Sequence, residues 1–169
     1  MLEVALQRET PWPELDWETL AGAAVRAAFA ESPYGEWIEH YSTFEISVRL
    51  TGDDEVRALN AQYRGKDKPT NVLSFPMVQP DLLDTVSLNS DDGEVLLGDI
   101  ALAHGVCAAE AVERGVSVEA HAQHLIVHGT LHLLGFDHEM DAEAEAMEAM
   151  ERAALAALGL HDPYPVRED

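Results

Sequence analysis

Apolar and polar side chains alternate strictly between residues 44 and 50 of this chain, where every second residue is apolar. A period of two places the two sets on opposite faces of a β-strand, because successive side chains point to opposite sides. The pattern therefore predicts a strand with one buried face and one face toward solvent. Shorter apolar segments predict further strands at 2–7, 71–75 and 95–103, the last of them buried.

A longer period, near that of an α-helix, marks the helical segments. Residues 17–30 carry one amphipathic pattern, and a second helix is expected between its caps, Asp53 and Asp54, and the terminating Gly65. Three further helices are expected at about 104–114, at about 117–134 with Ser117 as N-cap, and at about 141–158 with Asp141 as N-cap.

These helices and strands intermix without a regular βαβα rhythm, which favours the α+β class. The predicted fold is a small mixed β-sheet packed with about five helices. A length of 169 residues suits one domain, so we expect a single unit over residues 1–169. Residues 77–93, with their run of Asp and Ser, are expected to form a long exposed loop.

Charge is the unusual part of the composition, because 32 acidic residues face 10 basic ones and the net charge is −22. Such a field repels nucleic acid at long range, and its simplest interpretation is a solvated acidic surface. Cys107 is the single cysteine, so an internal disulfide is excluded and a reducing compartment is favoured. Because no signal peptide or membrane-spanning stretch is recognisable, we expect a soluble, cytoplasmic protein without a membrane partner.

The candidate chemistry lies in HGTLHLLGFDH (128–138). His128 and His132 are four residues apart on a predicted helix, so their side chains share one face and can bind one zinc ion. Gly135 is expected to end the helix, and the reversed chain can bring His138 back beside the other two. Three protein ligands leave the fourth tetrahedral position open, which is the arrangement of catalytic zinc in a zinc-hydrolase-like metal helix.

The alternative interpretation is three unrelated histidines, each satisfied in its own surroundings. His121 and His124 lie on the same helix, and a supporting or capping role suits them better than direct ligation. In metalloproteases of the H-E-x-x-H type, the glutamate after the first histidine is the general base. That position is Gly129 in this chain, so the pattern argues against a peptidase.

A second candidate feature is the basic loop, which we define by Arg64, Lys66 and Lys68. It holds both lysines of the chain and three of its ten basic residues. The functional interpretation is a phosphate clamp in which Arg64 supplies a forked donor; the alternative is pairing with acidic neighbours on the surface. Thr70 and Asn71 can hold the loop by hydrogen bonds from side chain to backbone.

Two aspartates near these motifs are open to more than one interpretation. Asp99 lies among apolar residues and is a candidate buried carboxylate that orients a zinc-ligating imidazole. It can equally serve backbone groups at a strand bulge beside Gly98. Asp137 precedes His138, and a turn role suits it better than a place near the metal.

Together the motifs resemble the YbeY family of bacterial endoribonucleases. The matching segments are YRGKDKPTNVLSFP (63–76), LGDIALA (97–103), HGTLHLLGFDH (128–138) and LGLHDPY (158–164), within a likeness that runs over residues 44–164. The resemblance implies a compact α+β fold with a metal-binding cleft and one zinc ion on His128, His132 and His138. It also implies that Arg64 is a functional residue in that cleft.

The activity that the resemblance implies is zinc-dependent, single-strand-selective RNA cleavage in 16S rRNA maturation and ribosome quality control. The expected partners are the 16S rRNA precursor, the small ribosomal subunit and assembly factors. We expect Arg64 and His128 to be catalytic, and Arg64, Lys66 and Lys68 to bind RNA. The strongly negative net charge argues against capture of RNA by the protein surface as a whole. The basic loop or a partner must therefore supply the attraction. Two alternatives are a non-catalytic ribosome-assembly factor with structural zinc and a zinc peptidase.

Overall fold

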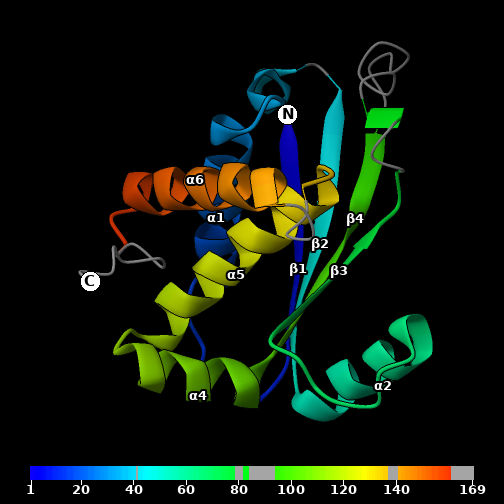
Figure 1. Ribbon diagram of the computed structural model, residues 1–169, viewed down its shortest axis with the longest axis vertical. Helices are drawn as coiled ribbons and strands as arrows, with labels where there is room; N and C mark the ends of the chain where they lie inside the picture. Colours follow the sequence, from blue (N-terminus) through cyan, green and yellow to red (C-terminus); the bar gives the residue numbers. More distant parts are fainter. Residues whose placement is uncertain (41, 79–81, 84–93, 137–140, 161–169) are drawn as a thin grey trace.

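The computed structural model describes residues 1–40, 42–78, 82–83, 94–136 and 141–160 (Figure 1). Its strands are β1 (Leu2–Arg8), β2 (Thr43–Thr51), β3 (Val72–Pro76) and β4 (Glu94–Ala103). Its helices are α1 (Trp17–Glu31), α2 (Asp53–Arg64), α4 (His104–Arg114), α5 (Val118–Leu133) and α6 (Asp141–Ala157), with a 3-10 helix η1 at Gly35–Glu39. Five α-helices and one mixed sheet in the described part of the chain confirm the predicted α+β class.

The four strands form one sheet in the order β1-β2-β4-β3. β1, β2 and β4 run parallel to one another, and β3 is an antiparallel edge strand paired with β4. The pairing of β2 with β4 contains a bulge, because Glu45 pairs with Leu96 whereas Ile46 pairs with Gly98. A Cβ atom at Gly98 would lie 2.5 Å from the carbonyl oxygen of Phe75, so glycine is required where β3 closes on the bulge.

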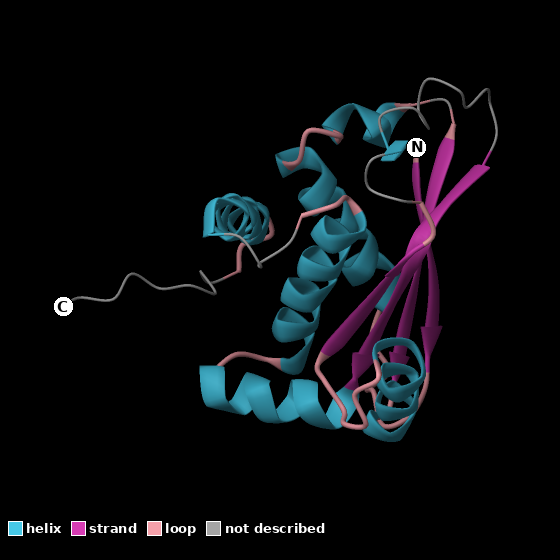
Figure 2. Ribbon diagram, turned by 45° about the vertical axis from the view of Figure 1, so that its right-hand side comes forward, coloured by secondary structure: helices cyan, strands magenta, loops and turns pink. Residues whose placement is uncertain are grey.

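One face of the sheet carries the main core. The predicted alternation in β2 is confirmed, since Phe44, Ile46, Val48 and Leu50 are all buried. This face is covered by α1 and α5, with α6 packed on those two helices (Figure 2). α2 and α4 lie at one end of the sheet, and the opposite face is left largely uncovered by helices of the described residues.

The structure adds one element that the sequence pattern did not predict. η1 holds Trp37 in the core, where its ring stacks on that of Phe44 with centroids 4.2 Å apart. Such a short helix is set by this tertiary contact rather than by a local period. Of the expected loop at 77–93, the structure describes residues 77, 78, 82 and 83, and Leu83 is buried in the core rather than exposed. Among the described helices, none combines the length and the apolar composition that a membrane crossing requires.

Candidate functional site

α5 presents four histidines along one side: His121, His124, His128 and His132. The helix starts as predicted, because the Oγ of Ser117 accepts a hydrogen bond from the Ala120 amide at 3.1 Å. It ends before Gly135, whose positive φ of 97° agrees with the prediction that this glycine ends the helix. Spacings of three and four residues place the four imidazoles on adjacent turns, one above another.

Gly129 sets how closely α5 lies on the sheet. A Cβ atom there would lie 3.1 Å from two carbons of Ile100 and 3.2 Å from the Oγ of Ser74. The helix therefore contacts β4 and β3 through its own backbone at this turn. The position of the protease glutamate faces the sheet, and it has no room for a carboxylate side chain.

His128 and His132 are the two predicted zinc ligands within the described residues. Their ring centroids lie 4.9 Å apart, with the ring planes at 68°. The Nδ1 of His128 lies 2.5 Å from the Oε1 of Glu151 on α6. Nδ1 is therefore the ring nitrogen that faces the carboxylate, and this contact favours the tautomer that is protonated there, in which Nε2 is the nitrogen that ligates a metal ion.

Glu151 is fully buried, and its second oxygen lies 3.7 Å from the Nε2 of His124. The sequence reasoning missed this residue. A signal was present, because Glu151 falls on the apolar stripe of α6, four residues after Met147 and three before Ala154. A carboxylate at a core position of an amphipathic helix indicates a specific buried partner.

In the N-terminal half of α5, a second histidine contacts a carboxylate, here on α4. The Nε2 of His121 lies 2.8 Å from the Oε1 of Glu110, which also accepts a hydrogen bond from the Asn71 side chain at 3.0 Å. Burial lowers the pKa of His121, although Glu110 acts in the opposite direction. A cavity of about 120 Å³ joins the two halves, and it is lined by Asn71, Val72, Arg114, His121, His124, Leu125 and His128.

The donor set of α5 fits a zinc ion. Two imidazoles one helical turn apart, one of them with its second nitrogen held by a carboxylate, are what histidine-zinc sites use. His138 and Asp137 lie outside the described residues, so the third ligand stays a prediction. Within the described ranges alone, no three metal-ligating side chains are grouped closely enough to hold an ion.

The basic loop follows the C-terminus of α2, which ends at Gly65 with a φ of 68°. Arg57 pairs with Asp67 through two hydrogen bonds of 2.8 and 3.2 Å, and Asn60 donates to the Lys68 carbonyl at 2.8 Å.

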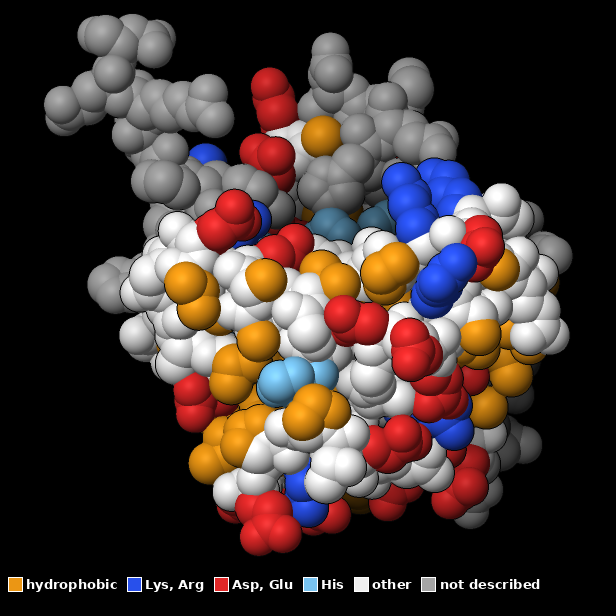
Figure 3. Space-filling model, turned by 90° about the horizontal axis from the view of Figure 1, so that it is seen from below, with side chains coloured by type: hydrophobic (Ala, Val, Ile, Leu, Met, Phe, Trp, Pro, Cys, Tyr) orange, Lys and Arg blue, Asp and Glu red, His pale blue; other side chains and the backbone are white. Residues whose placement is uncertain are grey.

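These contacts fix the loop backbone while Arg64, Lys66 and Lys68 stay exposed. No salt bridge between described residues uses any of the three, which disfavours the surface-pairing alternative. Figure 3 shows Lys and Arg side chains gathered at the side of the molecule that α2 forms.

The loop leads directly into β3 through Asn71. As predicted, the Asn71 side chain bonds a backbone group, since its Oδ1 accepts from the Val72 amide at 2.7 Å. Its Nδ2 reaches Glu110, the carboxylate that also holds His121. One residue thus connects the basic loop to the histidine side of α5.

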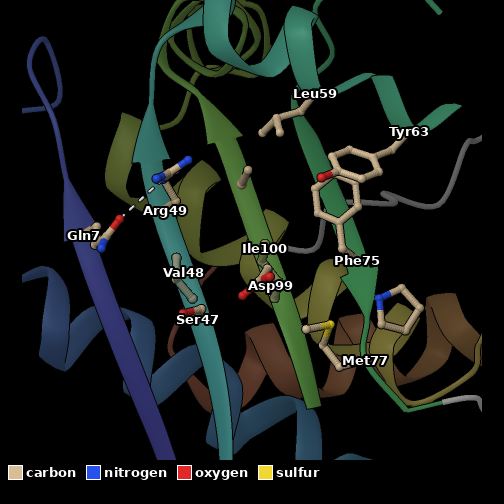
Figure 4. Close-up of a pocket in the computed structure, with 12 residues that line it drawn as sticks. Gln7, Ser47, Val48, Arg49, Leu59, Tyr63, Phe75, Met77, Asp99 and Ile100 are labelled. Atoms are coloured by element: carbon tan, nitrogen blue, oxygen red, sulfur yellow. Dashed lines mark hydrogen bonds between the residues drawn. The ribbon is translucent and has the colours of Figure 1, made fainter. Parts of the chain in front are cut away.

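The uncovered face of the sheet holds a separate cavity of about 720 Å³ (Figure 4). Its polar lining includes Gln7, Ser47, Arg49 and Asp99, and its apolar lining includes Leu59, Tyr63, Phe75 and Met77. Asp99 pairs with Ser47 across the strands and faces this cavity. Its neighbour Ile100 faces α5 instead. The carboxylate in contact with the imidazole of His128 is therefore Glu151 and not Asp99. The alternative placement of Asp99 beside a strand bulge agrees with the register.

Comparison with known proteins identifies the family to which this chain is similar. The family described as endoribonuclease YbeY matches residues 6–159. The chain belongs to the YbeY endoribonuclease family. It is 62% identical over 170 residues to the endoribonuclease YbeY of Rhizorhabdus wittichii, with 100% of both chains covered. It is 57% identical to that of Sphingopyxis alaskensis, over 97% of this chain and 98% of the relative.

A more distant YbeY relative, from Zymomonas mobilis, is 47% identical over 99% of this chain and 96% of its own length. Among solved structures, the solution structure of TM1509 from Thermotoga maritima resembles this fold with a TM-score of 0.52 and 22% identity. That likeness covers 98% of this chain and 100% of the other. It supports the arrangement of sheet and helices, whereas the YbeY relatives support the family.

Proposed function

We propose that this chain is an endoribonuclease that cleaves single-stranded RNA with one zinc ion held by His128, His132 and His138. The observation that carries the proposal is the contact between Nδ1 of His128 and a buried carboxylate. His132 lies one helical turn from His128, and the chain belongs to the YbeY family. When bound, zinc supplies Lewis acidity toward a phosphoryl oxygen. The support for RNA as substrate is the name that the relatives carry.

The basic loop supplies the contacts to the phosphate backbone in this proposal. Arg64, Lys66 and Lys68 are exposed, without salt-bridge partners among the described residues, on a backbone held by Arg57 and Asn60. Arg64 can donate two parallel hydrogen bonds to one phosphate and offset the charge that develops on it during cleavage. Asn71 fixes the spacing between this loop and the histidines of α5.

The biological setting in the proposal is cytoplasmic 16S rRNA maturation and ribosome quality control, with the precursor RNA, the small subunit and assembly factors as partners. A net charge of −22 supports presentation of the RNA by such a partner, because the free protein repels RNA at long range. A peptidase is disfavoured, since Gly129 packs on Ile100 and leaves no space for a general base at that position.

Cleavage of a labelled single-stranded RNA, compared with its duplex, tests the proposal when zinc content is measured on the same samples. We expect His128→Ala to lose zinc and activity, and Arg64→Ala to lose activity while it keeps zinc. Arg26→Ala is the matched control, because Arg26 is exposed on α1. If folded His128→Ala and Arg64→Ala both kept full activity, the proposed mechanism would be wrong. Zinc that stays bound without any RNA cleavage would favour a non-catalytic assembly factor.

A further inference from the structure

Glu151 is a carboxylate in the interior of the molecule. It lies on α6 among buried apolar residues and is 0% exposed. An unpaired charge at such a place is strongly destabilising, so its neighbours must stabilise it. The described contacts of its two oxygens are with imidazoles, 2.5 Å to the Nδ1 of His128 and 3.7 Å to the Nε2 of His124.

We propose that Glu151 is a positioning residue that holds His128 with Nδ1–H toward α6 and Nε2 toward the metal ion. The inference rests on the zinc of the proposed function. A neutral imidazole otherwise divides between two tautomers, and only the one with a bare Nε2 can bind zinc on that side. A hydrogen bond to a buried carboxylate selects this tautomer, fixes the ring plane and makes Nε2 a stronger donor.

The position of Glu151 on α6 extends this role from one side chain to two helices. His128 lies on α5, and α6 follows α5 along the chain after residues 137–140. The hydrogen bond therefore ties the ligand helix to the helix that follows the segment with His138. His124 lies one turn earlier on α5, so the same carboxylate contacts two successive turns of the histidine stripe.

The test is a zinc affinity measured by competition with a chelator, on the full chain and without reference to activity. Glu151→Gln keeps the shape but removes the charge, and we expect zinc binding to weaken about 10- to 100-fold. Glu145→Gln is the matched control, because Glu145 is exposed on the same helix; its affinity should equal that of the wild type. If Glu151→Gln does not fold, Glu151→Asp retains the charge, draws it back by one methylene and should bind zinc more weakly than the wild type.

A second readout is the tautomer of His128 in the metal-free protein, measured by long-range ¹H–¹⁵N NMR at pH 8. We expect a protonated Nδ1 in the wild type and a mixture in Glu151→Gln. A folded Glu151→Gln with unchanged zinc affinity and unchanged tautomer would overturn the inference and leave the proposed function standing. A wild type that binds no zinc would overturn both, and this outcome is recognised before any variant is made.

The cavity on the uncovered sheet face carries a second, independent inference. Tyr63 is 62% exposed at its rim, and its ring centroid lies 5.2 Å from that of Phe75 (Figure 4). Met77, also exposed, lies beside the pair. Exposed aromatic rings of this kind are stacking platforms for the bases of single-stranded nucleic acid, since every base has a flat π-face.

The surroundings of Tyr63 favour RNA as the occupant. The next residue is Arg64, and the basic loop follows, so phosphates bound there would place a neighbouring base near the ring. Asp99 and Ser47 lie on the cavity floor, where a carboxylate and a hydroxyl can bond the N–H groups of a base edge. We infer that this cavity binds a base of single-stranded RNA against Tyr63, an inference that rests on the proposed function.

Equilibrium binding of a short single-stranded RNA to the zinc-loaded protein tests this subsite, with the same RNA made abasic as the comparison. We expect Tyr63→Ala to weaken binding roughly 5- to 150-fold, and Tyr63→Phe to bind like the wild type because it keeps the ring. Abasic RNA should bind Tyr63→Ala and wild type equally. Unchanged affinity in Tyr63→Ala would overturn the subsite alone, whereas a wild type that neither binds nor cleaves RNA would also overturn the proposed function.

Discussion

Gly129 shows how one residue separates this site from a metalloprotease site. The glutamate that a protease needs would start from a Cβ atom 3.1 Å from Ile100 and 3.2 Å from Ser74. Crowding of this kind pushes the helix off the sheet, and that shift would also move His128 relative to Glu151. Gly129 therefore has two effects: it leaves the site without the general base of a protease, and it allows the helix to place His128 beside Glu151.

Substitution of Gly129 by alanine should measure this packing. Gly22 lies inside α1 with no atom within 4 Å of its would-be Cβ, so Gly22→Ala should gain up to about 1 kcal/mol from helix propensity. Gly129→Ala has the same gain but must displace Ile100, and overpacking costs about 1–3 kcal/mol. We expect its free energy of unfolding in urea to fall at least about 1 kcal/mol below that of Gly22→Ala. Equal values would show that the contact with the sheet is loose.

His121 gives a pH dependence whose sign can be derived. It is buried and faces Glu110, His124 and Arg114, and burial lowers its pKa below the ordinary value of about 6.5. The unfolded chain therefore binds a proton at a higher pH than the folded one. This contribution to stability is complete above about pH 6.5 and is lost as the pH falls toward the lowered folded pKa.

Urea unfolding of the metal-free protein between pH 5 and 7.5 checks this assignment. The wild type should lose stability more steeply below pH 6.5 than His121→Gln, which cannot titrate there. Metal-free samples keep zinc release out of the comparison. Parallel curves for the two proteins would contradict the assignment and place the acid sensitivity on other groups.

At the scale of elements, several helix ends were predictable because their signals are local. The expected cap of α2 was wrong, because its N-cap is Gly52 and the Asp53 carboxylate accepts a hydrogen bond from the Val106 amide instead. Gly65 and Gly115 both adopt left-handed conformations at the end of their helices, and Ser117 caps α5. The bulge between β2 and β4 was not predictable in position, because it depends on which strands pair. η1 was missed for a similar reason, since its Trp37 is held by Phe44 of a later strand.

Gly65 ends α2 in a left-handed conformation and starts the backbone of the basic loop. This conformation predicts how a substitution at Gly65 changes stability. The Gly65 amide bonds the Ala61 carbonyl and the Lys66 amide bonds the Asn60 carbonyl, each at 3.2 Å, with φ of 68° between them. Alanine in the left-handed region costs about 1–2 kcal/mol, so Gly65→Ala should lower the free energy of unfolding by that amount. Gly22→Ala is the control, because Gly22 lies inside α1 with open space around its would-be Cβ and no left-handed φ. Equal losses in the two variants would refute the role of the conformation.

At the scale of the whole molecule, the candidate site draws on segments far apart in the chain. Its ligand helix was predictable because His128 and His132 lie one turn apart on the same element. The contact of Glu151 with His128 was not, since it joins residues 23 positions apart across two helices. The same limit applied to Asp99, whose apolar neighbours predicted a buried carboxylate. It is half-buried instead, and it lines the cavity on the uncovered face of the sheet.

The last prediction follows from the overall charge and concerns how RNA binding depends on salt concentration. In the proposed function, a molecule with net charge −22 meets RNA through one loop of three cations. Counterion release from a single strand gives a slope of about −0.7 per phosphate contact in a plot of log K against log salt, so three contacts give about −2. Lys66→Ala combined with Lys68→Ala should reduce the slope to about −0.7, whereas Arg26→Ala should leave it unchanged. A wild-type slope steeper than about −4 would mean more than five phosphate contacts, and cations outside the basic loop would then have to bind the RNA.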